Sequence, residues 1–372
     1  MSGSLSGIKV LVLAGMGPVP FISMLLADHG AEVVRVTRPR NRSARALTQT
    51  EGLTPERDVV ERGIESVEID LKAPEGRETV LRLAASADVF VEGFRPGVVE
   101  RLGLGPGEVR ARNERIVYAR LTGYGQTGPR AKQAGHDINY VAQSGVLSAL
   151  GRADAAPFPP INLLGDYAAG GAVGAFGVAA ALVSAQRTGQ GQVLDIAMLD
   201  GAALLTAKLH GLRASGLHSD ERGTNFLDGG APFYDTYECA DRRYLAVGAL
   251  EPDFYREFID RLGVDTDDWP AQSDRAQWPR LRELIASAVA ARPLSEWNEV
   301  YSGTDACVTP VLSFAEAAAD EHNRARGIYS EVAGALHPAP APKFSGTPAP
   351  TPAAPNSAHL DAGELLREWE RA

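Results

Sequence analysis

The sequence has few cysteines and nothing that resembles a targeting signal. Its two cysteines, Cys239 and Cys307, lie far apart without a CxxC spacing, which excludes a disulfide framework and a cysteine-based zinc site. The N-terminus lacks the basic and apolar regions of a signal peptide, and the C-terminus lacks a Ser-Lys-Leu address. We expect no apolar run long enough to span a membrane. These features predict a cytoplasmic protein in a reducing compartment, with no membrane partner.

Positive charge is also scarce. The chain has 37 basic and 47 acidic residues, a formal net charge of −10. A net anionic surface argues against general binding to nucleic acid or anionic membranes, so an anionic ligand would need its own local basic site. The 372 residues, 44% of them hydrophobic, are enough for one large domain with appendages or for two domains.

A complete dinucleotide fingerprint is missing as well. The turn from Gly15 to Pro18 follows a predicted strand, but Pro20 occupies the position of the third glycine of GxGxxG. Pro18 also removes a backbone donor at the helix start where a pyrophosphate would bind. An NAD-dependent dehydrogenase is therefore a minor alternative. A tight strand-to-helix turn is the simpler interpretation, and a turn that lines an acyl or pantetheine channel is another.

What is present is an alternation of strands and helices. Strands are predicted at 8–13, 32–36, 67–71, 88–92, 116–121 and 192–197, and helices at 20–29, 74–85, 167–185 and 201–212, with a polar, irregular stretch at 38–58. The order strand, turn, helix, strand predicts a parallel sheet with helical crossovers, a doubly wound α/β fold.

The second half predicts a smaller α+β domain. Residues 234–250 alternate like a hairpin with its turn at 241–243. Helices are predicted at 253–262, 278–290 and 294–303, an extended Pro/Ala-rich segment at 337–355, and a closing amphipathic helix at 360–371. We therefore predict a large Rossmann-like domain (1–213), a linker (214–230), a small α+β domain (231–315) and a return segment that packs on the large domain (316–372).

Two titratable residues stand out in polar surroundings. His136 lies in a glycine-flanked turn, and Asp166 lies at the mouth of the apolar helix, where an N-cap role would explain it fully. The ordinary pKa of histidine is near neutrality. An imidazole and a carboxylate that share a pocket can move a proton from one face of a carbon to the other. Each residue alone also has an ordinary structural explanation.

Other charged residues are candidates of the same kind. Glu251 follows an apolar strand and precedes Pro252, so it is either displayed at a strand end or solvated at a helix start. Four cations near predicted strand ends or loops could bind phosphate groups, although each one singly is equally well a solvated charge: Arg38, Lys72, Arg95 and Arg101.

Several longer motifs occur in a fixed order. They are VEGFRPG at 91–97, RLGLG at 101–105, TGYGQTGP at 122–129, AGHDINY at 134–140, LDGGAPFYDTYEC at 227–239, VGALEP at 247–252 and DACVTPV at 305–311. In this order they resemble the α-methylacyl-CoA racemases within the family III CoA-transferase superfamily. The resemblance runs from residue 5 to about residue 311, and the closing helix matches more loosely.

The resemblance implies a fold and a set of site residues. It implies a Rossmann-like large domain, a smaller domain and an interlocked homodimer that binds acyl-CoA, with a role in fatty-acid metabolism. His136 and Asp166 would be the opposed acid and base, and Glu251 would orient the histidine. Arg38, Lys72, Arg95 and Arg101 would bind the nucleotide and phosphates of CoA, and Gly135, Asp137 and Tyr140 would line the thioester region.

The mechanism that it implies is a 1,1-proton transfer through an enolate. Neutral His136 would serve the (S) face and Asp166 the (R) face, and N–H groups at the Asp166 helix start would stabilise the thioester oxygen. No metal or redox cofactor is expected, because CoA is part of the substrate.

Two further functions stay open. In the transferase branch of the superfamily the matching aspartate attacks the acyl-CoA as a nucleophile, so Asp166 alone does not separate the two reactions. His136 and Glu251 favour the racemase. In place of the usual basic stretch the chain has Glu61–Ser66, with Ile64 and Glu65 where cations are common, and Val19 where glycine is common. These departures suggest altered acyl preference or a non-catalytic acyl-CoA-binding paralogue.

Overall fold

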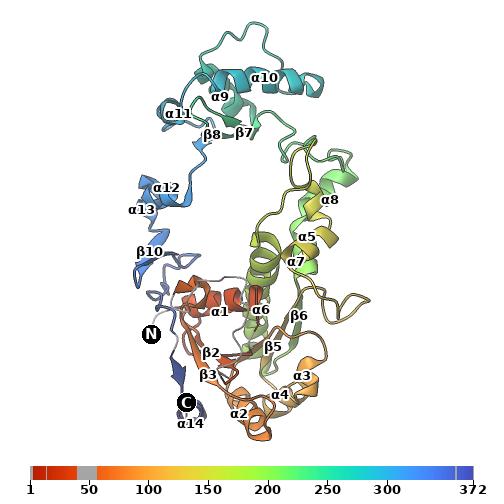
Figure 1. The fold of residues 1–372 in the computed structure, drawn as a ribbon, viewed down its shortest axis with the longest axis vertical. Coiled ribbons are helices and arrows are strands. Elements are labelled where there is room, and N and C mark those ends of the chain that lie inside the picture. The colour runs from red at the N-terminus through yellow and green to blue at the C-terminus, as the bar shows by residue number, and fades with distance from the viewer. Residues whose placement is uncertain (1–2, 14, 40–56, 357, 372) are drawn as a thin grey trace. The chain divides into compact units, whose positions relative to one another are not determined.

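A computed structural model describes residues 3–13, 15–39, 57–356 and 358–371 (Figure 1). The described residues form two compact units. The first unit draws on 1–144, 161–205 and 322–372, and the second unit consists of 145–160 and 206–321. The predicted small domain therefore lies within the second unit. Most of the predicted irregular stretch, residues 40–56, lies outside the described residues.

The first unit contains a seven-stranded sheet with the order β12-β3-β2-β1-β4-β5-β6, and every pairing in it is parallel. Its strands are β1 (Lys9–Leu13), β2 (Glu32–Thr37), β3 (Ile64–Glu68), β4 (Val89–Glu92), β5 (Val117–Thr122), β6 (Val193–Ala197) and β12 (His359–Leu360). The predicted doubly wound α/β fold is confirmed. The strand predicted at 67–71 begins earlier, at Ile64, because Ile64 pairs with Val33 and buries its side chain.

Helices cover both faces of this sheet (Figure 1). One face carries α1 (Pro18–Asp28), η4 (Leu163–Ala172) and α6 (Val173–Thr188); the other carries α2 (Pro74–Ala85), α3 (Val98–Arg101), α4 (Pro106–Arg112) and α14 (Ala362–Arg371). Because strand side chains alternate, Val10 and Val12 join the core beneath α1, whereas Leu11 and Leu13 join the core beneath α2. Each face of the sheet therefore has its own apolar core.

The remaining elements of the first unit are shorter. They are η2 (Val59–Glu61), α5 (Asp137–Gln143), α7 (Met198–Leu205) and the antiparallel pair β10 (Tyr329–Val332) and β11 (Ala335–Pro338), with α13 (Glu321–Arg326) at the boundary of the units. The predicted helix at 201–212 is two helices, α7 and α8 (Ala207–Ala214), because the helical course breaks at Thr206.

The continuous helix from Leu163 to Thr188 has 26 residues, and by length and composition alone it could cross a membrane. Our expectation of no such run was therefore wrong. Its small residues have a packing role: a Cβ atom on Gly171 would lie 2.3 Å from Phe21, and one on Gly170 would lie 2.7 Å from Pro18. The buried face of this helix packs against α1, α7 and the sheet strands β5 and β6.

The second unit is built on the antiparallel sheet β7-β8-β9. Its remaining elements are β7 (Tyr234–Glu238), β8 (Tyr244–Gly248), β9 (Val308–Pro310), η3 (Val146–Ala149), α9 (Pro252–Leu262), η5 (Arg275–Gln277), α10 (Trp278–Val289), α11 (Leu294–Tyr301) and α12 (Phe314–Ala319). The hairpin turn contains Arg242 at φ 61°, and the core gathers around Trp297, Phe258 and Leu281. The predicted hairpin and its three following helices are confirmed.

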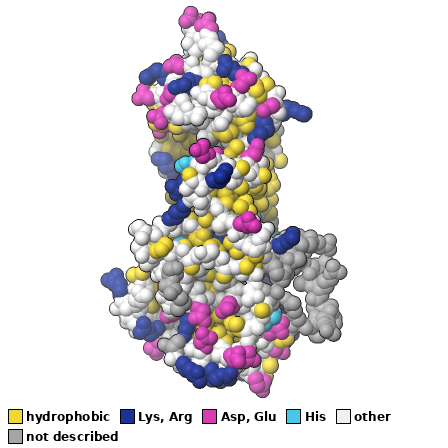
Figure 2. Space-filling model, turned by 90° about the vertical axis from the view of Figure 1, so that its left-hand side faces the viewer, with side chains coloured by type: hydrophobic (Ala, Val, Ile, Leu, Met, Phe, Trp, Pro, Cys, Tyr) yellow, Lys and Arg dark blue, Asp and Glu magenta, His cyan; other side chains and the backbone are white. Residues whose placement is uncertain are grey.

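Charges of both signs are interspersed over the molecular face in Figure 2. One ion pair is instead buried. Arg62 and Asp28 are 2% and 4% exposed, and the guanidinium donates to both carboxylate oxygens, at 2.9 and 2.6 Å. Arg62 also donates to the carbonyl of Pro338 at 2.7 Å, so it ties the return segment to the end of α1. Arg62 is thus structural, and its neighbour Ile64 is a core residue at 3% exposure.

Removing one partner of this ion pair should destabilise the fold, because the other partner remains as a buried, unpaired charge. We expect Arg62→Leu to lower the free energy of unfolding by about 3–5 kcal/mol in urea titrations. The double variant Arg62→Leu, Asp28→Leu should recover part of the loss. Arg112→Leu is the control, since its partner Glu78 and Arg112 itself are 49% and 45% exposed, and it should cost less than about 1 kcal/mol. Equal losses for the two single variants would contradict a special role for Arg62.

Candidate active site

The carboxyl ends of β1 and β4 form a topological switch point in the sheet order. Chain segments leave these neighbouring strands toward opposite sides, and open α/β sheets bind ligands at such points. The Gly15–Pro18 turn follows β1, and the loop with Arg95 follows β4. Two predicted site segments therefore leave the sheet at the same place.

Asp166 lies against the turn that follows β1. Gly17 has φ 63°, and a Cβ atom on it would lie 2.9 Å from Oδ1 of Asp166. Only glycine allows both this left-handed backbone and this approach. A carboxylate at this turn repels a pyrophosphate, which adds a physical reason against the dinucleotide interpretation.

Asp166 is not an N-cap, so that prediction was wrong. Asn162 precedes the helix, and Asp166 lies in the first turn of a π-helical segment, η4. Its backbone N–H donates to Oδ2 of Asp137 at 2.7 Å. That N–H is therefore occupied and is not available for the thioester oxygen, and the role of the other N–H groups at this helix start stays a prediction. Single π-helical turns are frequent at functional sites.

His136 immediately precedes α5, and its side chain is exposed. Its backbone N–H donates to Oδ1 of Asn139 at 3.0 Å, which fixes the turn before the helix. The next residue, Asp137, is buried and bonds to the backbone of Asp166. The structure thus brings the His136 segment and the Asp166 segment together, as predicted.

Burial raises the pKa of Asp166, and the nearby negative charge of Asp137 raises it further. A hydrogen bond from Asn162, at 3.4 Å, and the charge of His136 act in the opposite direction. The net result is a carboxyl that holds its proton more strongly than a solvated aspartate. Such a group is suited to exchange a proton with a ligand.

Tyr140 is closely packed in the same site. Cβ atoms on Gly123 and Gly135 would lie 2.0 and 2.7 Å from its ring, and Tyr124 meets it edge to face at a centroid distance of 4.9 Å. Burial, followed by the neighbouring Tyr124 and Asp166, raises the pKa of Tyr140 to about 12, while the charge of Arg95 lowers it. Gly135, Tyr140 and Arg95 therefore belong to the Asp166 neighbourhood.

The other predicted cations stand around the same edge of the sheet. Arg38 follows β2, Lys72 follows β3, and Arg101 ends α3. These side chains and Arg95 are exposed, and none of the four forms an ion pair with another described residue. Their role in binding CoA stays a prediction.

A buried ion pair at the end of β4 was not predicted from the sequence. Arg120 is bonded to Glu92 at 2.9 Å and to Glu100 at 2.8 Å, and Glu92 accepts the N–H of Phe94 at 2.8 Å. This network holds the loop that carries Arg95. Its only signal in the sequence was a glutamate inside the VEGFRPG motif, where an apolar residue is the usual occupant of a buried strand.

Comparisons with known proteins give a consistent result. Residues 5–359 match the model of CoA-transferase family III. The chain belongs to this family. It is 44% identical to the alpha-methylacyl-CoA racemase of Mus musculus, over 98% of this chain and 93% of that protein. It is 45% identical to the alpha-methylacyl-CoA racemase of Homo sapiens, over 93% of this chain and 88% of that protein.

Solved structures show the same fold. A CaiB/BaiF family protein from Brucella suis has a TM-score of 0.83 at 24% identity and covers 99% of this chain and 100% of its own. A hypothetical protein from Mycobacterium tuberculosis has a TM-score of 0.81 at 26% identity, and the match covers 98% of this chain and 99% of that protein.

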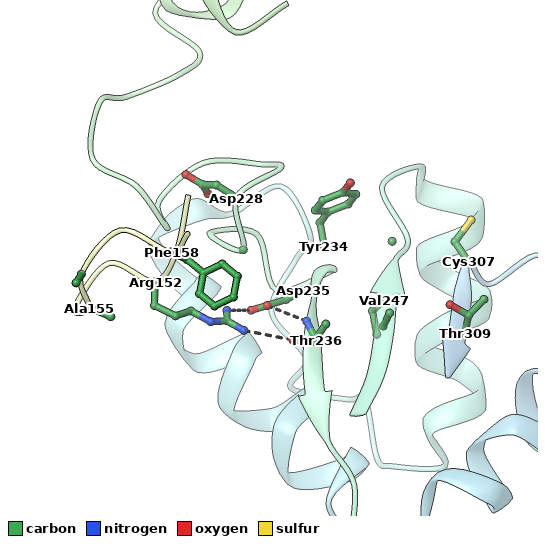
Figure 3. Close-up of a pocket in the computed structure, with 15 residues that line it drawn as sticks. Arg152, Ala155, Phe158, Asp228, Tyr234, Asp235, Thr236, Val247, Cys307 and Thr309 are labelled. Carbon is green, nitrogen blue, oxygen red and sulfur yellow. Dashed lines mark hydrogen bonds and ion pairs between the residues drawn. The ribbon is translucent and has the colours of Figure 1, made fainter. Parts of the chain in front are cut away.

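Three of the family-like motifs also meet in the second unit. They line a cavity of about 800 Å³, into which Phe158, Tyr234 and Val247 contribute apolar surface (Figure 3). Arg152 bonds to Asp235 at 2.6 Å and closes one side, and Cys307 lies on the other. Sequence analysis did not predict this cavity.

Glu251 lies in the second unit, at the start of α9, and its side chain is exposed. Its negative charge helps to raise the pKa of Cys307, after the larger effect of burial. Its predicted pairing with His136 stays a prediction.

The raised pKa of Asp166 has a consequence for stability. Because the folded pKa exceeds the unfolded one, the ionised side chain costs folding free energy at pH values above the folded pKa, and this cost is absent below the unfolded pKa. We expect Asp166→Asn to raise the free energy of unfolding at pH 7, by at most about 1 kcal/mol because the group is partly solvated.

The gain should disappear as the pH is lowered through the carboxyl range, in urea titrations at several pH values. Asp220→Asn is the control: its exposed ion pair with Arg213 lowers its pKa, so the substitution should not stabilise the protein at pH 7. A destabilised Asp166→Asn protein at neutral pH would contradict the prediction.

Proposed function

We propose that this protein racemises 2-methylacyl-CoA thioesters by 1,1-proton transfer through an enolate. The observation that carries the proposal is geometric: Asp166 lies against the turn after β1, at the switch point of the sheet, and its backbone is hydrogen-bonded to Asp137, the residue that follows His136. The identity of 44–45% to proteins named alpha-methylacyl-CoA racemase, over nearly the whole chain, supports it.

The chemistry requires two proton carriers on opposite faces of one carbon. The α-C–H beside a thioester is a weak acid, so neutral His136 removes the (S) proton while protonated Asp166 returns one to the (R) face. In the reverse direction the roles exchange. A raised pKa of Asp166 favours the protonated form that this step needs. The residues themselves carry the protons, so we propose that no metal or redox cofactor takes part.

The phosphates of CoA are anionic and need a cationic anchor, which the cations without an ion pair among the described residues offer. We propose that Arg38, Lys72, Arg95 and Arg101 bind the phosphates and nucleotide of CoA, while Gly135, Asp137 and Tyr140 line the thioester region. We further propose that Glu251 orients the imidazole of His136. Guanidinium groups without a protein partner are suited to phosphate.

A CoA-transferase with Asp166 as nucleophile is the second candidate, since relatives in the family carry that name; the succinyl-CoA–D-citramalate CoA-transferase of Chloroflexus aurantiacus is 34% identical. A raised pKa makes the ionised form of Asp166 less available for nucleophilic attack, which supports the racemase proposal. The non-catalytic alternative loses part of its basis, because Ile64 packs in the core rather than at a ligand site.

The activity test is exchange of the α-proton. In D₂O, (R)- or (S)-2-methylacyl-CoA should gain α-deuterium and lose optical purity, measured by NMR and chiral chromatography. His136→Ala and Asp166→Ala should each lower the rate by about 10²–10⁴-fold. His322→Ala, an exposed histidine on α13, is the control and should leave the rate unchanged. No exchange across several acyl chains would remove the proposal.

The transferase is tested separately. Hydroxylamine should trap no acylated Asp166 when a second carboxylic acid is present with acyl-CoA. Trapping that persists in His136→Ala would instead identify a transferase, because nucleophilic attack does not need the imidazole.

We also propose a homodimer, which the family resemblance implies. The helical layer of 161–205 exposes large apolar side chains: Ile161 at 70%, Leu163 at 53%, Phe176 at 75%, Val183 at 55%, Leu204 at 62% and Leu205 at 51%. Phe176 and Val183 are seven residues apart, so they share one face of α6. Apolar surface of this kind is usually covered by a partner.

Light scattering during size exclusion should therefore give twice the chain mass of 39.4 kDa. Phe176→Asp should shift the equilibrium toward the monomer, because it places a charge in the proposed interface. Val264→Asp, at an exposed position after α9, is the control and should leave the dimer intact. A monomeric wild-type protein would refute this part of the proposal.

A further inference from the structure

The carboxylate of Asp137 is an unusual buried acid. Its residue is 6% exposed, and Oδ2 accepts the backbone N–H of Asp166 at 2.7 Å. The other oxygen, Oδ1, is buried and has no hydrogen-bond partner among the described residues. A buried carboxylate with an unused oxygen is costly, so its retention calls for a function.

Asp137 is packed closely against the backbone of Gly165. A Cβ atom on Gly165 would lie 2.6 Å from Oδ2 and 3.2 Å from the Cα of Asp137. Glycine at 165 therefore lets α5 approach η4, and the Asp137 carboxylate lies against the peptide bond between Gly165 and Asp166. One side chain thus joins the segment of His136 to the segment of Asp166.

The groups that face the Asp166 carboxyl come from three segments. From α5 and the residue before it they are Asp137, His136 and the hydroxyl of Tyr140; from the turn before η4, Asn162 contributes a neutral donor at 3.4 Å. From the turn after β1, Gly17 contributes only backbone. Asp137 is thus the acidic neighbour of Asp166 in the described part of the chain.

We propose that Asp137 is a positioning residue for Asp166: its carboxylate fixes the backbone of Asp166 in the π-helical turn, and its negative charge favours the protonated form of the Asp166 carboxyl. This inference rests on the proposed racemase function, because a protonated Asp166 is the group that delivers a proton to the α-carbon. A negative charge next to a carboxyl disfavours ionisation of that carboxyl, and Asp137 raises the pKa of Asp166 in this way, after the larger effect of burial.

The charge and the hydrogen bond can be separated by substitution. Asp137→Asn keeps a carbonyl oxygen as acceptor for the N–H of Asp166 but removes the charge. Without that charge, Asp166 should ionise at lower pH. The acid limb of the pH profile of kcat/KM, which reports the ionisation of Asp166, should shift down by about half a pH unit or more. The plateau should fall by up to about tenfold, since a shift of one unit removes nine-tenths of the protonated form of Asp166.

Asp88→Asn is the matched control. The Asp88 carboxylate also accepts a backbone N–H, that of Lys9 at 2.9 Å, but it lies at the amino end of β4, on the opposite edge of the sheet from the site. This variant should leave the acid limb where it is. A merely structural role of Asp137 would lower activity at every pH without moving the limb.

A second measurement uses the unmodified protein and needs no turnover. Infrared titration follows the carboxyl band of Asp166, identified by its loss in Asp166→Asn. The inference expects a pKa above that of a solvated aspartate in the wild type and a lower pKa in Asp137→Asn. It is overturned by an ordinary pKa in the wild type, which remains measurable even if Asp137→Asn does not fold, or by an unmoved pKa in the folded variant.

Failure of the inference and failure of the proposed function give different results. If the wild type exchanges no α-proton while the infrared shift is present, the racemase proposal fails and the coupling of the two carboxyl groups stands. If exchange occurs but neither the acid limb nor the infrared pKa responds to Asp137→Asn, the coupling fails and the racemase proposal stands.

Discussion

The close approach of α1 to the glycine-rich start of the long helix is the constraint on which the site depends. Gly170 and Gly171 have no Cβ atoms that would collide with Pro18 and Phe21. The two helix starts can therefore meet above the carboxyl ends of the strands. Because Gly17 also lacks a side chain, the turn after β1 comes to rest against the carboxylate of Asp166. A methyl group at any of these glycines would force the layers apart.

This packing decides the electrostatics. Asp166 is half-buried, faces a second acid and receives a single weak hydrogen bond on its side chain from the described residues, so its ionised form is disfavoured. The stability of the first unit comes from elsewhere, from the two cores of the sheet and from the buried pair of Arg62 and Asp28. A rigid scaffold can hold two carboxyl groups whose charges repel each other, whereas a flexible scaffold would let them move apart into solvent.

Membership of CoA-transferase family III does not by itself choose the reaction, since relatives of this chain are named as racemases and as CoA-transferases. The choice depends on what surrounds the carboxyl. Here the surroundings include the imidazole of His136 and the carboxylate of Asp137, and our proposal of proton exchange is based on them. The cations of the neighbouring loops are compatible with either reaction, because both use a CoA thioester.

The order of strands, the hairpin and most helices followed from local pattern, because alternation and helical periodicity are written in adjacent residues. The motifs around His136 and Asp166 also indicated the candidate site. Element ends were less certain: β3 begins at Ile64, and Asp166 lies within a π-helical turn instead of capping a helix. Both differences come from tertiary contacts, the pairing of Ile64 with Val33 and the bond from Asp166 to Asp137.

The sequence by itself therefore determined the fold class and the chemical groups available for function. Only the tertiary structure decided that Arg62 is a buried anchor, that Arg120 and Glu92 hold the Arg95 loop, and that Asp137 sets the environment of Asp166. The physical reason is that these effects depend on burial and on distances between residues far apart in the chain. Neither quantity is present in a linear pattern.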